Sequence, residues 1–216
     1  ARDEIATKLS AVRTLTAARD RGTALVTVCS ACHNVIKQTN FDISRDGDMA
    51  RKINNYMKPE IPYTGETQVY HFLELLRDVI GFDELKKAVV KPLKGKKIAA
   101  YYGCLLLRPA AALAMDDPEN PSIMEDFIKA IGATPVVYAQ RNECCGGYIA
   151  IEDKAQAAKR SRAVMDSALD NGADMIITAC PLCLYNLRKN SGSELPVHYF
   201  TELLAQALGL KEVADE

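Results

Sequence analysis

The sequence lacks tryptophan altogether, contains only three histidines, and has few aromatic residues, 6% of its 216 positions. It also lacks an excess of charge of one sign, because the formal net charge is -1, and this argues against nucleic acid as the main partner. No apolar run approaches the roughly 18 residues of a membrane span. The opening stretch ARDEIATKLS is polar and unlike a signal peptide. With 48% apolar and 25% charged residues, the composition is typical of a globular protein of one large or two small domains.

Against these absences, the chain is rich in cysteine. Two C-x-x-C motifs, one adjacent pair and one single residue make up the set Cys29, Cys32, Cys104, Cys144, Cys145, Cys180 and Cys183. A secreted disulfide scaffold would usually be shorter and would carry an even number of cysteines. Thiols grouped in this way, without an export signal, indicate metal or redox ligands in a reducing compartment. We therefore expect a cytoplasmic protein.

Two blocks of sequence recur in the same order. DRGTALVTVCSACHNV at 20–35 matches DNGADMIITACPLCLYN at 170–186, and VYHFLELL at 69–76 matches VHYFTELL at 197–204. Matched blocks in the same order indicate an internal duplication. We expect residues 92–216 to form a complete repeat and residues 1–91 the rear part of a first repeat whose front part is missing from the sequence. A duplication that was partial from the start is the alternative.

Short apolar strands alternate with helices along the chain. The expected helices are 2–19, 30–38, 66–90, 120–132, 149–171 and 197–209, and the expected strands are 23–28, 96–102, 134–139 and 174–179. Such alternation predicts an α/β fold in which each repeat is a small parallel sheet flanked by helices.

The cysteines of the complete repeat follow its strands. Cys104 comes after one strand, Cys144 and Cys145 after the next, and Cys180 with Cys183 after the third. The carboxyl ends of parallel strands share one edge of the sheet, where open α/β sheets bind ligands, so the five thiols are expected to converge. Five thiols are one more than a structural zinc site or an ordinary [4Fe–4S] cubane takes.

The residues around these thiols favour metal binding. Cys180 and Cys183 lie at the start of a predicted helix, whose unpaired N–H groups and dipole lower thiol pKa values. Pro181 suits the first turn of that helix. Gly146 and Gly147 allow the backbone to approach a cluster and to donate hydrogen bonds to it.

The order Cys104, Cys144-Cys145-Gly146, Cys180-x-x-Cys183 resembles the cysteine-rich CCG domain, which is duplicated in the B-type subunit of heterodisulfide reductase. The stretches YYGCLLLRP at 101–109 and PVHYFTELL at 196–204 strengthen the likeness. The resemblance implies an oxidoreductase that acts on a sulfur group, reducing the coenzyme M–coenzyme B heterodisulfide or an analogous small-molecule or protein disulfide. It also implies partner subunits, one containing flavin and others ferredoxin-like.

In that family each complete domain holds a [4Fe–4S] cluster of a noncubane type. The resemblance implies that the ligands here are Cys104, Cys144, Cys145, Cys180 and Cys183, and it identifies no separate catalytic residue. Cys29 and Cys32 would bind a first cluster in the whole protein. In this chain alone, free thiols, a disulfide and half of a zinc site remain open for them.

Two other functions remain open on the sequence. One is an electron-relay iron–sulfur subunit of another oxidoreductase, of the lactate, glycolate or glycerol-phosphate type. The other is a zinc-binding structural domain, with zinc as an alternative to the cluster or its replacement. Of the remaining polar residues, His33 is expected on a helix surface, and Arg108 either binds an anion or is a surface charge. His71 and His198 serve either helix capping and packing or a use near the clusters.

Overall fold

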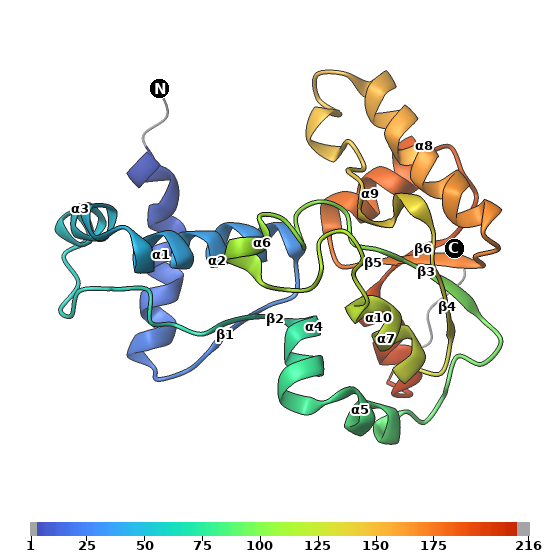
Figure 1. Cartoon of the computed structure of the whole chain (residues 1–216), viewed down its shortest axis with the longest axis horizontal. Helices are drawn as coiled ribbons and strands as arrows, with labels where there is room; N and C mark the ends of the chain where they lie inside the picture. The colour runs from blue at the N-terminus through green and yellow to red at the C-terminus, as the bar shows by residue number, and fades with distance from the viewer. Residues whose placement is uncertain (1–3, 211–216) are drawn as a thin grey trace.

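The computed structural model describes residues 4–210 (Figure 1). In chain order the elements are α1 (Glu4–Asp20), β1 (Leu25–Thr27), α2 (Ser30–Arg45), α3 (Gly47–Met57), β2 (Val69–His71), α4 (Phe72–Glu74), the π-helical segment η1 (Leu75–Ile80), α5 (Phe82–Ala88), β3 (Lys97–Tyr101), α6 (Ala110–Leu113), α7 (Ile123–Ala130), β4 (Thr134–Val136), the 3₁₀ turns η2 (Ala139–Asn142) and η3 (Gly147–Ile149), α8 (Lys154–Asp170), β5 (Met175–Thr178), α9 (Pro181–Asn190), β6 (Val197–Tyr199) and α10 (Phe200–Ala207).

The strands form two parallel sheets. The larger sheet has the strand order β4-β3-β5-β6, and the smaller sheet pairs β1 with β2. Figure 1 shows α8 and α9 on one side of the larger sheet and α7 and α10 on the other, while α1, α2 and α3 lie with the smaller sheet at the opposite end of the molecule. The predicted α/β fold with two small parallel sheets is confirmed.

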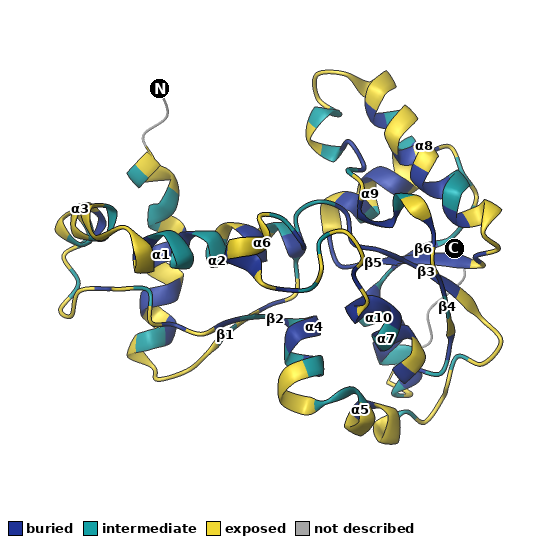
Figure 2. Cartoon of the chain, in the orientation of Figure 1, coloured by how far each residue is buried: buried dark blue, intermediate teal, exposed yellow. Residues whose placement is uncertain are grey.

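The larger sheet is buried on both faces, and its central strand shows why. Ile98 and Ala100 on β3 pack into the cluster that includes residues of α7 and α10. Ala99 and Tyr101 alternate with them and pack against α8 and α9. All four are 0% exposed, so the strand is apolar throughout, as expected for a parallel strand covered by helices on both sides. Figure 2 shows the strands of this sheet in dark blue between the helices of the larger part.

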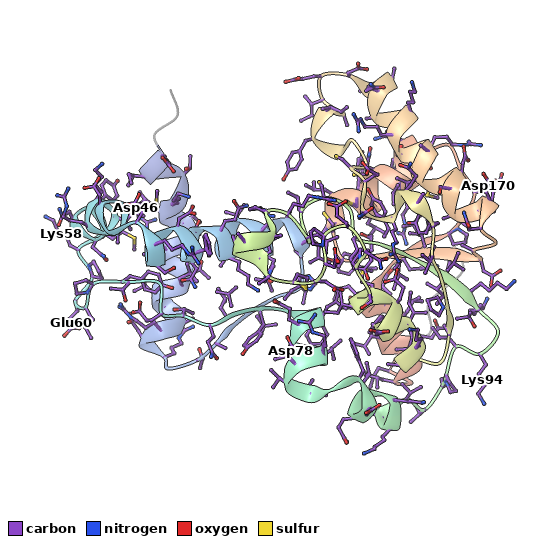
Figure 3. The ribbon with its side chains drawn as sticks, viewed as in Figure 1. Asp46, Lys58, Glu60, Asp78, Lys94 and Asp170 are labelled. Carbon is purple, nitrogen blue, oxygen red and sulfur yellow. The ribbon has the colours of Figure 1, made fainter. Side chains whose placement is uncertain are left out.

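The smaller part has its own core between α1, α2 and α3. Its buried members are Val12, Leu15, Ile43, Ile53, Tyr63 and Val69. Asp46 lies between α2 and α3, and its carboxylate accepts hydrogen bonds from the N–H groups of Asp48 and Met49 at 3.0 Å, so α3 begins immediately after α2 ends. Figure 3 shows Asp46, Lys58 and Glu60 at the outer end of this part, far from Asp170.

Two predicted helices turn out to begin as strands. The predicted helices 66–90 and 197–209 each include three residues that pair in a parallel ladder, β2 and β6. In both, the last strand residue opens a capping box. Glu74 accepts the N–H of His71, and Glu202 accepts the N–H of Tyr199, both at 2.7 Å. The helix therefore starts only after the strand has entered the sheet. Helix α3, in the insert between the matched blocks, was not predicted from the sequence.

The two parts of the chain are joined by polar contacts as well as by packing. The side-chain amide of Asn34 on α2 donates hydrogen bonds to the carbonyl oxygens of Leu105 and Arg108, at 2.7 and 2.8 Å. The Ser30 N–H and hydroxyl both donate to the carbonyl of Ala179. These contacts fix the start of α2 against the carboxyl edge of the larger sheet.

A buried ion pair lies next to the loop that carries the adjacent cysteines. Arg141 Nη1 is 2.6 Å from Glu125 Oε1, and the two side chains are 8% and 5% exposed. The Tyr102 hydroxyl donates to the second oxygen of Glu125 and accepts the N–H of Met124 at 2.9 Å. The Arg141 carbonyl accepts the N–H of Tyr102 at 2.8 Å. The network ties the end of β3 to the segment that leads into Cys144.

We expect Arg141→Met to lower the free energy of unfolding by about 3–5 kcal/mol, because the Glu125 charge would remain buried without a partner. The matched control is Lys129→Met, which removes a surface ion pair with Asp126 on α7 and should cost less than about 1 kcal/mol. Urea titrations of the reduced, metal-free protein measure both values. A loss for Arg141→Met as small as the control's would contradict a structural role for the buried pair.

Candidate metal centre

The five cysteines that follow strands of the larger sheet line a single pocket. Its walls are Tyr102, Cys104, Leu105, Cys144, Cys145, Gly147, Tyr148, Cys180, Leu182 and Cys183. No Lys, Arg, Asp or Glu is among these residues, so apart from the thiols the lining is mostly apolar. The structure thus brings together the five thiols that were expected to converge.

The strand order explains this convergence. β3 lies between β4 and β5, with Ala99 opposite Val136 on one side and Ile176 on the other. The segments that leave the carboxyl ends of the three strands are therefore neighbours, and each carries one or two of the cysteines.

Close backbone approach requires glycine at this site. The Gly146 N–H donates to Cys144 Sγ at 3.4 Å, and Cys145 Sγ lies 3.5 Å from Cys183 Sγ. Gly103 has a φ of 63°, and a Cβ atom there would lie only 3.2 Å from Cys183 Sγ. A side chain at position 103 would be strained and would press on the thiol.

Hydrogen bonds hold the loop that bears the adjacent cysteines. The Asn186 side chain donates to the Cys145 carbonyl at 2.6 Å, and the Tyr101 hydroxyl donates to the Glu143 carbonyl at 2.7 Å. Asn186 and Tyr101 are not distinctive in the sequence. Only their positions relative to the loop give them this role.

Arg108 also holds the loop. Its guanidinium donates to the carbonyl oxygens of Asn142 and Pro118 and lies 3.0 Å from the Glu119 carboxylate. The sequence left open whether Arg108 binds an anion. In the structure its guanidinium is already bonded to these three residues. Arg108 is therefore a structural residue that fixes the approach to the cysteine pair.

The thiols lie close enough to change one another's pKa values. A hydrogen bond with Cys104 lowers the pKa of Cys144 to about 6, and one with Cys183 lowers the pKa of Cys180 to about 6. Cys183, whose Sγ is 3.5 Å from that of Cys145, also lowers the pKa of Cys145. The pKa values of Cys104 and Cys183, which retain the protons, are raised by the same bonds. The pocket therefore offers thiolates, the form that binds metals.

This donor set suits a group with several metal atoms. Within residues 4–210, no three His, Cys, Asp or Glu side chains converge on a point where a single metal ion could bind. The five sulfurs instead surround a space. Thiolate ligands around an apolar pocket are the chemistry that iron–sulfur clusters require, and the residues present fit such a group.

The C-x-x-C motif of Cys29 and Cys32 lies beside this pocket but does not line it. Cys29 and Cys32 begin α2, and the exposed Cys32 lines a separate groove that also reaches Tyr148. Inside this motif, the Ser30 N–H donates to the Ala179 carbonyl at 2.9 Å, and Ala31 packs against the cluster that contains Cys180 and Cys183. The two C-x-x-C motifs are therefore direct neighbours in space.

Tyr199 joins the two motifs at their bases. Its hydroxyl lies 2.5 Å from the carbonyl oxygen of Val28 and 2.8 Å from that of Ala179. Val28 and Ala179 are the residues that directly precede Cys29 and Cys180. One phenol thus spans both strand-to-helix turns.

The predicted surface position of His33 is wrong. Its side chain is 0% exposed, and Nδ1 lies 2.9 Å from the Thr27 hydroxyl. Burial lowers the pKa of His33 to about 3, so the ring is neutral although Glu74 lies 3.4 Å from Nε2. The duplication could have predicted that His33 is buried, because the matched position in the complete repeat is the apolar Leu184.

The other two histidines differ in position. His71 caps α4, where its Nδ1 accepts the N–H of Leu73 at 3.2 Å, and burial lowers its pKa to about 3. The residue at the matching place in the second block is Tyr199, while His198 is the neighbouring residue on β6 and is buried. Helix capping therefore explains His71.

Comparison with known proteins identifies the part of the chain that contains the five cysteines of the pocket. Residues 98–188 match the family model of the cysteine-rich domain CCG. Among the described residues, no helix is long and apolar enough to cross a membrane.

Similar proteins cover most of the chain. It is 29% identical over 96% of its length to the 8-methylmenaquinol:fumarate reductase membrane anchor subunit of Wolinella succinogenes, spanning 75% of that protein. It is 28% identical over 86% of its length to the B-type subunit of the ferredoxin:CoB-CoM heterodisulfide reductase of Methanosarcina mazei, spanning 65% of it. The B-type subunit of a ferredoxin/F(420)H(2)-dependent CoB-CoM heterodisulfide reductase of Methanosarcina acetivorans is 27% identical over 92% of the chain, which spans 70% of that relative.

A crystal structure of a hypothetical protein from Helicobacter pylori has the same fold. Its TM-score is 0.72 over 97% of this chain and 40% of the other, at 11% sequence identity. Residues 98–188 thus match the CCG cysteine-rich domain, and the chain is similar over most of its length to B-type subunits of heterodisulfide reductases, as the sequence motifs predict.

Proposed function

We propose that the chain is the iron–sulfur subunit of a heterodisulfide reductase-type complex and that it reduces a disulfide at a noncubane [4Fe–4S] cluster. The observation that carries the proposal is the single pocket lined by five thiols at the carboxyl edge of the larger sheet. Cys104, Cys144, Cys145, Cys180 and Cys183 would hold the cluster.

A bound cluster would supply electrons one at a time. The chain's own residues determine its surroundings. Leu105 and Leu182 keep the pocket apolar, and the glycine N–H at Gly146 donates to sulfur. Fewer hydrogen-bond donors and less water around the sulfurs alter the reduction potential of such a group.

The overall reaction converts one disulfide, two electrons and two protons into two thiols. The disulfide is the coenzyme M–coenzyme B heterodisulfide or an analogous small-molecule or protein disulfide. We propose that flavin-containing and ferredoxin-like subunits of the same complex supply the electrons, and that the complex works in the cytoplasm. The names of the Methanosarcina relatives, which are subunits of ferredoxin-linked complexes, support this arrangement.

The Wolinella relative favours a second candidate, an electron-relay subunit of a quinone-linked oxidoreductase. In that case the same cluster would exchange electrons with a quinone rather than cleave a disulfide. Reoxidation of the reduced protein by a disulfide, compared with reoxidation by a quinone, distinguishes the two candidates.

We also propose that residues 1–91 are the rear part of a first repeat and residues 92–216 a complete second one. The strand registers support this. When Cys29 is aligned with Cys180, each residue pair of the smaller sheet has a counterpart in the larger one: Leu25–Val69 with Ile176–Val197, Val26–Tyr70 with Ile177–His198, and Thr27–His71 with Thr178–Tyr199.

The exposed groove at Cys32 supports the same proposal. In the complete repeat the Cys144–Gly147 loop lies between α8 and α9, where a Cβ atom on Gly146 would be 3.0 Å from Ala157 Cα and where Asn186 bonds the Cys145 carbonyl. Aligning the ends of α1 and α8, Asp20 with Asp170, places Thr7 at the position of Ala157, and aligning Cys29 with Cys180 places Val35 at the position of Asn186. Both Thr7 and Val35 line the groove. The groove is the place that a matching cysteine loop would occupy.

The open side of β1 agrees with this. Val26 and Val28 are 41% and 51% exposed, whereas the aligned Ile177 and Ala179, covered by β3 and its helices, are 0% and 1% exposed. We propose that Cys29 and Cys32 bind a first cluster only when a segment outside residues 4–210 covers β1 and adds the remaining thiols.

We expect the anaerobically prepared chain to contain about four iron and four acid-labile sulfide atoms, as in one [4Fe–4S] cluster. Cys145→Ser should lose most of this iron, because Cys145 is buried in the wall of the pocket. The circular dichroism spectrum should stay unchanged. A full iron content with an unaltered EPR signal in this variant would refute the five-ligand site, and zinc without sulfide would favour a structural metal domain.

The duplication provides a matched pair of variants. The double variant Cys180→Ser/Cys183→Ser should abolish iron binding, while the equivalent double variant Cys29→Ser/Cys32→Ser should leave the iron and sulfide content of the isolated chain unchanged. Metal and sulfide analysis measures both. Equal losses in the two variants would mean that the C-x-x-C motifs share one cluster, contrary to the two-site proposal.

A further inference from the structure

Tyr148 lies between the two sets of cysteines, the five that line the pocket and the C-x-x-C motif of Cys29 and Cys32. It lines the five-thiol pocket together with Leu182, and it also lines the groove at Cys32. It belongs to the loop of the complete repeat, yet it reaches the surface of the first one. Its side chain borders both places.

The backbone holds Tyr148 in this position. It is the middle residue of the 3₁₀ turn η3, in which the Ile149 N–H donates to the Gly146 carbonyl at 3.1 Å. The Asp153 N–H donates to the Ile149 carbonyl at 2.7 Å, which connects the turn to the start of α8. Tyr148 is 64% exposed although its neighbours on the pocket wall, Cys145 and Cys183, are buried.

The hydroxyl of Tyr148 differs from those of the other tyrosines near the thiols. Tyr101 donates to the Glu143 carbonyl, Tyr102 to Glu125, and Tyr199 to the carbonyl groups at the bases of the two motifs. Tyr148 has no hydrogen-bond partner among residues 4–210. A phenol is protonated at neutral pH, so this hydroxyl is able to donate a hydrogen bond.

The charge around Tyr148 limits what it can bind. Neither the five-thiol pocket nor the groove is lined by Lys, Arg, Asp or Glu. The two walls themselves therefore offer no ion pair to a carboxylate, sulfonate or phosphate, and desolvating such a group against them would be unfavourable. Arg160, which lies beside Gly146 and whose charge acts on Cys144, is close to the pocket but is not part of its lining. An uncharged group that accepts a hydrogen bond from Tyr148 and is attached to apolar atoms fits the linings of both the pocket and the groove.

We propose that Tyr148 is a substrate-positioning residue that closes the mouth of the five-thiol pocket with its ring and donates a hydrogen bond to an uncharged electron-accepting group of the substrate. The group is held between the pocket and the Cys32 groove. A disulfide sulfur and a quinone carbonyl share this chemistry. The inference rests on the proposed redox function for its substrate, but the closure of the pocket is independent of it.

The first test uses the metal-free chain. Tyr148→Ala should increase the rate at which a maleimide labels the buried Cys180 and Cys183 at least severalfold, because the mouth is opened, while Tyr148→Phe should label like the unmodified chain. Tyr185→Ala, at a comparably exposed tyrosine on α9, is the control and should change nothing. Equal labelling of Tyr148→Ala and the unmodified chain would overturn the closure.

The second test follows reoxidation of the reduced, cluster-loaded chain by two neutral probes, hydroxyethyl disulfide and menadione, and by the charged glutathione disulfide. For whichever of the two neutral probes reoxidises the protein, Tyr148→Phe should raise the half-saturating concentration by about three- to tenfold, which is the effect of one lost hydrogen bond. The maximal rate should be unchanged. Tyr185→Phe should behave like the unmodified chain.

The outcomes separate the two proposals. Reaction with hydroxyethyl disulfide or with menadione identifies the source of the acceptor group. Saturation by either neutral probe that is unaffected by Tyr148→Phe overturns the positioning role while leaving the redox function standing. Failure to bind iron and sulfide overturns the redox function. The maleimide labelling rates then still test whether the Tyr148 ring closes the mouth of the pocket.

Discussion

The parallel pairing of β3 with β4 and β5 is the constraint on which the site depends. Only this order makes neighbours of the three segments that carry Cys104, the adjacent pair and the second C-x-x-C motif. The pairing is maintained by apolar residues on both faces of β3, which pack into two separate helical layers. Burial of these apolar side chains, which lie outside the thiol pocket, therefore sets the positions of the thiols.

The polar contacts around the pocket hold the cysteine loop in place although gathering the thiolates costs free energy. Thiolates gathered in an apolar space repel one another, and their desolvation disfavours the charged form. Arg108, Asn186 and the Glu125–Arg141 pair nevertheless keep the loop in place. A cationic metal group would relieve this repulsion and would stabilise the folded state, since the assembled site exists only in that state.

The α/β alternation, the places of β1, β3, β4 and β5 in the chain and the convergence of five cysteines could be predicted from the sequence, because apolar runs and motif spacing are local signals. β2 and β6 were missed because a three-residue strand directly before a helix has no periodicity of its own, and its pairing partner lies elsewhere in the chain. The roles of Arg108 and Asn186 were missed for a similar reason. Their partners are backbone carbonyl groups whose positions exist only after folding.

The uncovered side of β1 has a consequence for handling the protein. Among residues 4–210, β1 pairs with β2 on one side and with no strand on the other, and Val26 and Val28 are exposed. Such an open strand edge is a template for pairing with another chain. Neither proline nor charge, which would normally discourage such contacts, interrupts the stretch LVTV. The isolated chain is therefore expected to self-associate through this edge as its concentration rises, and a segment covering β1 would act as the chain's protection against aggregation.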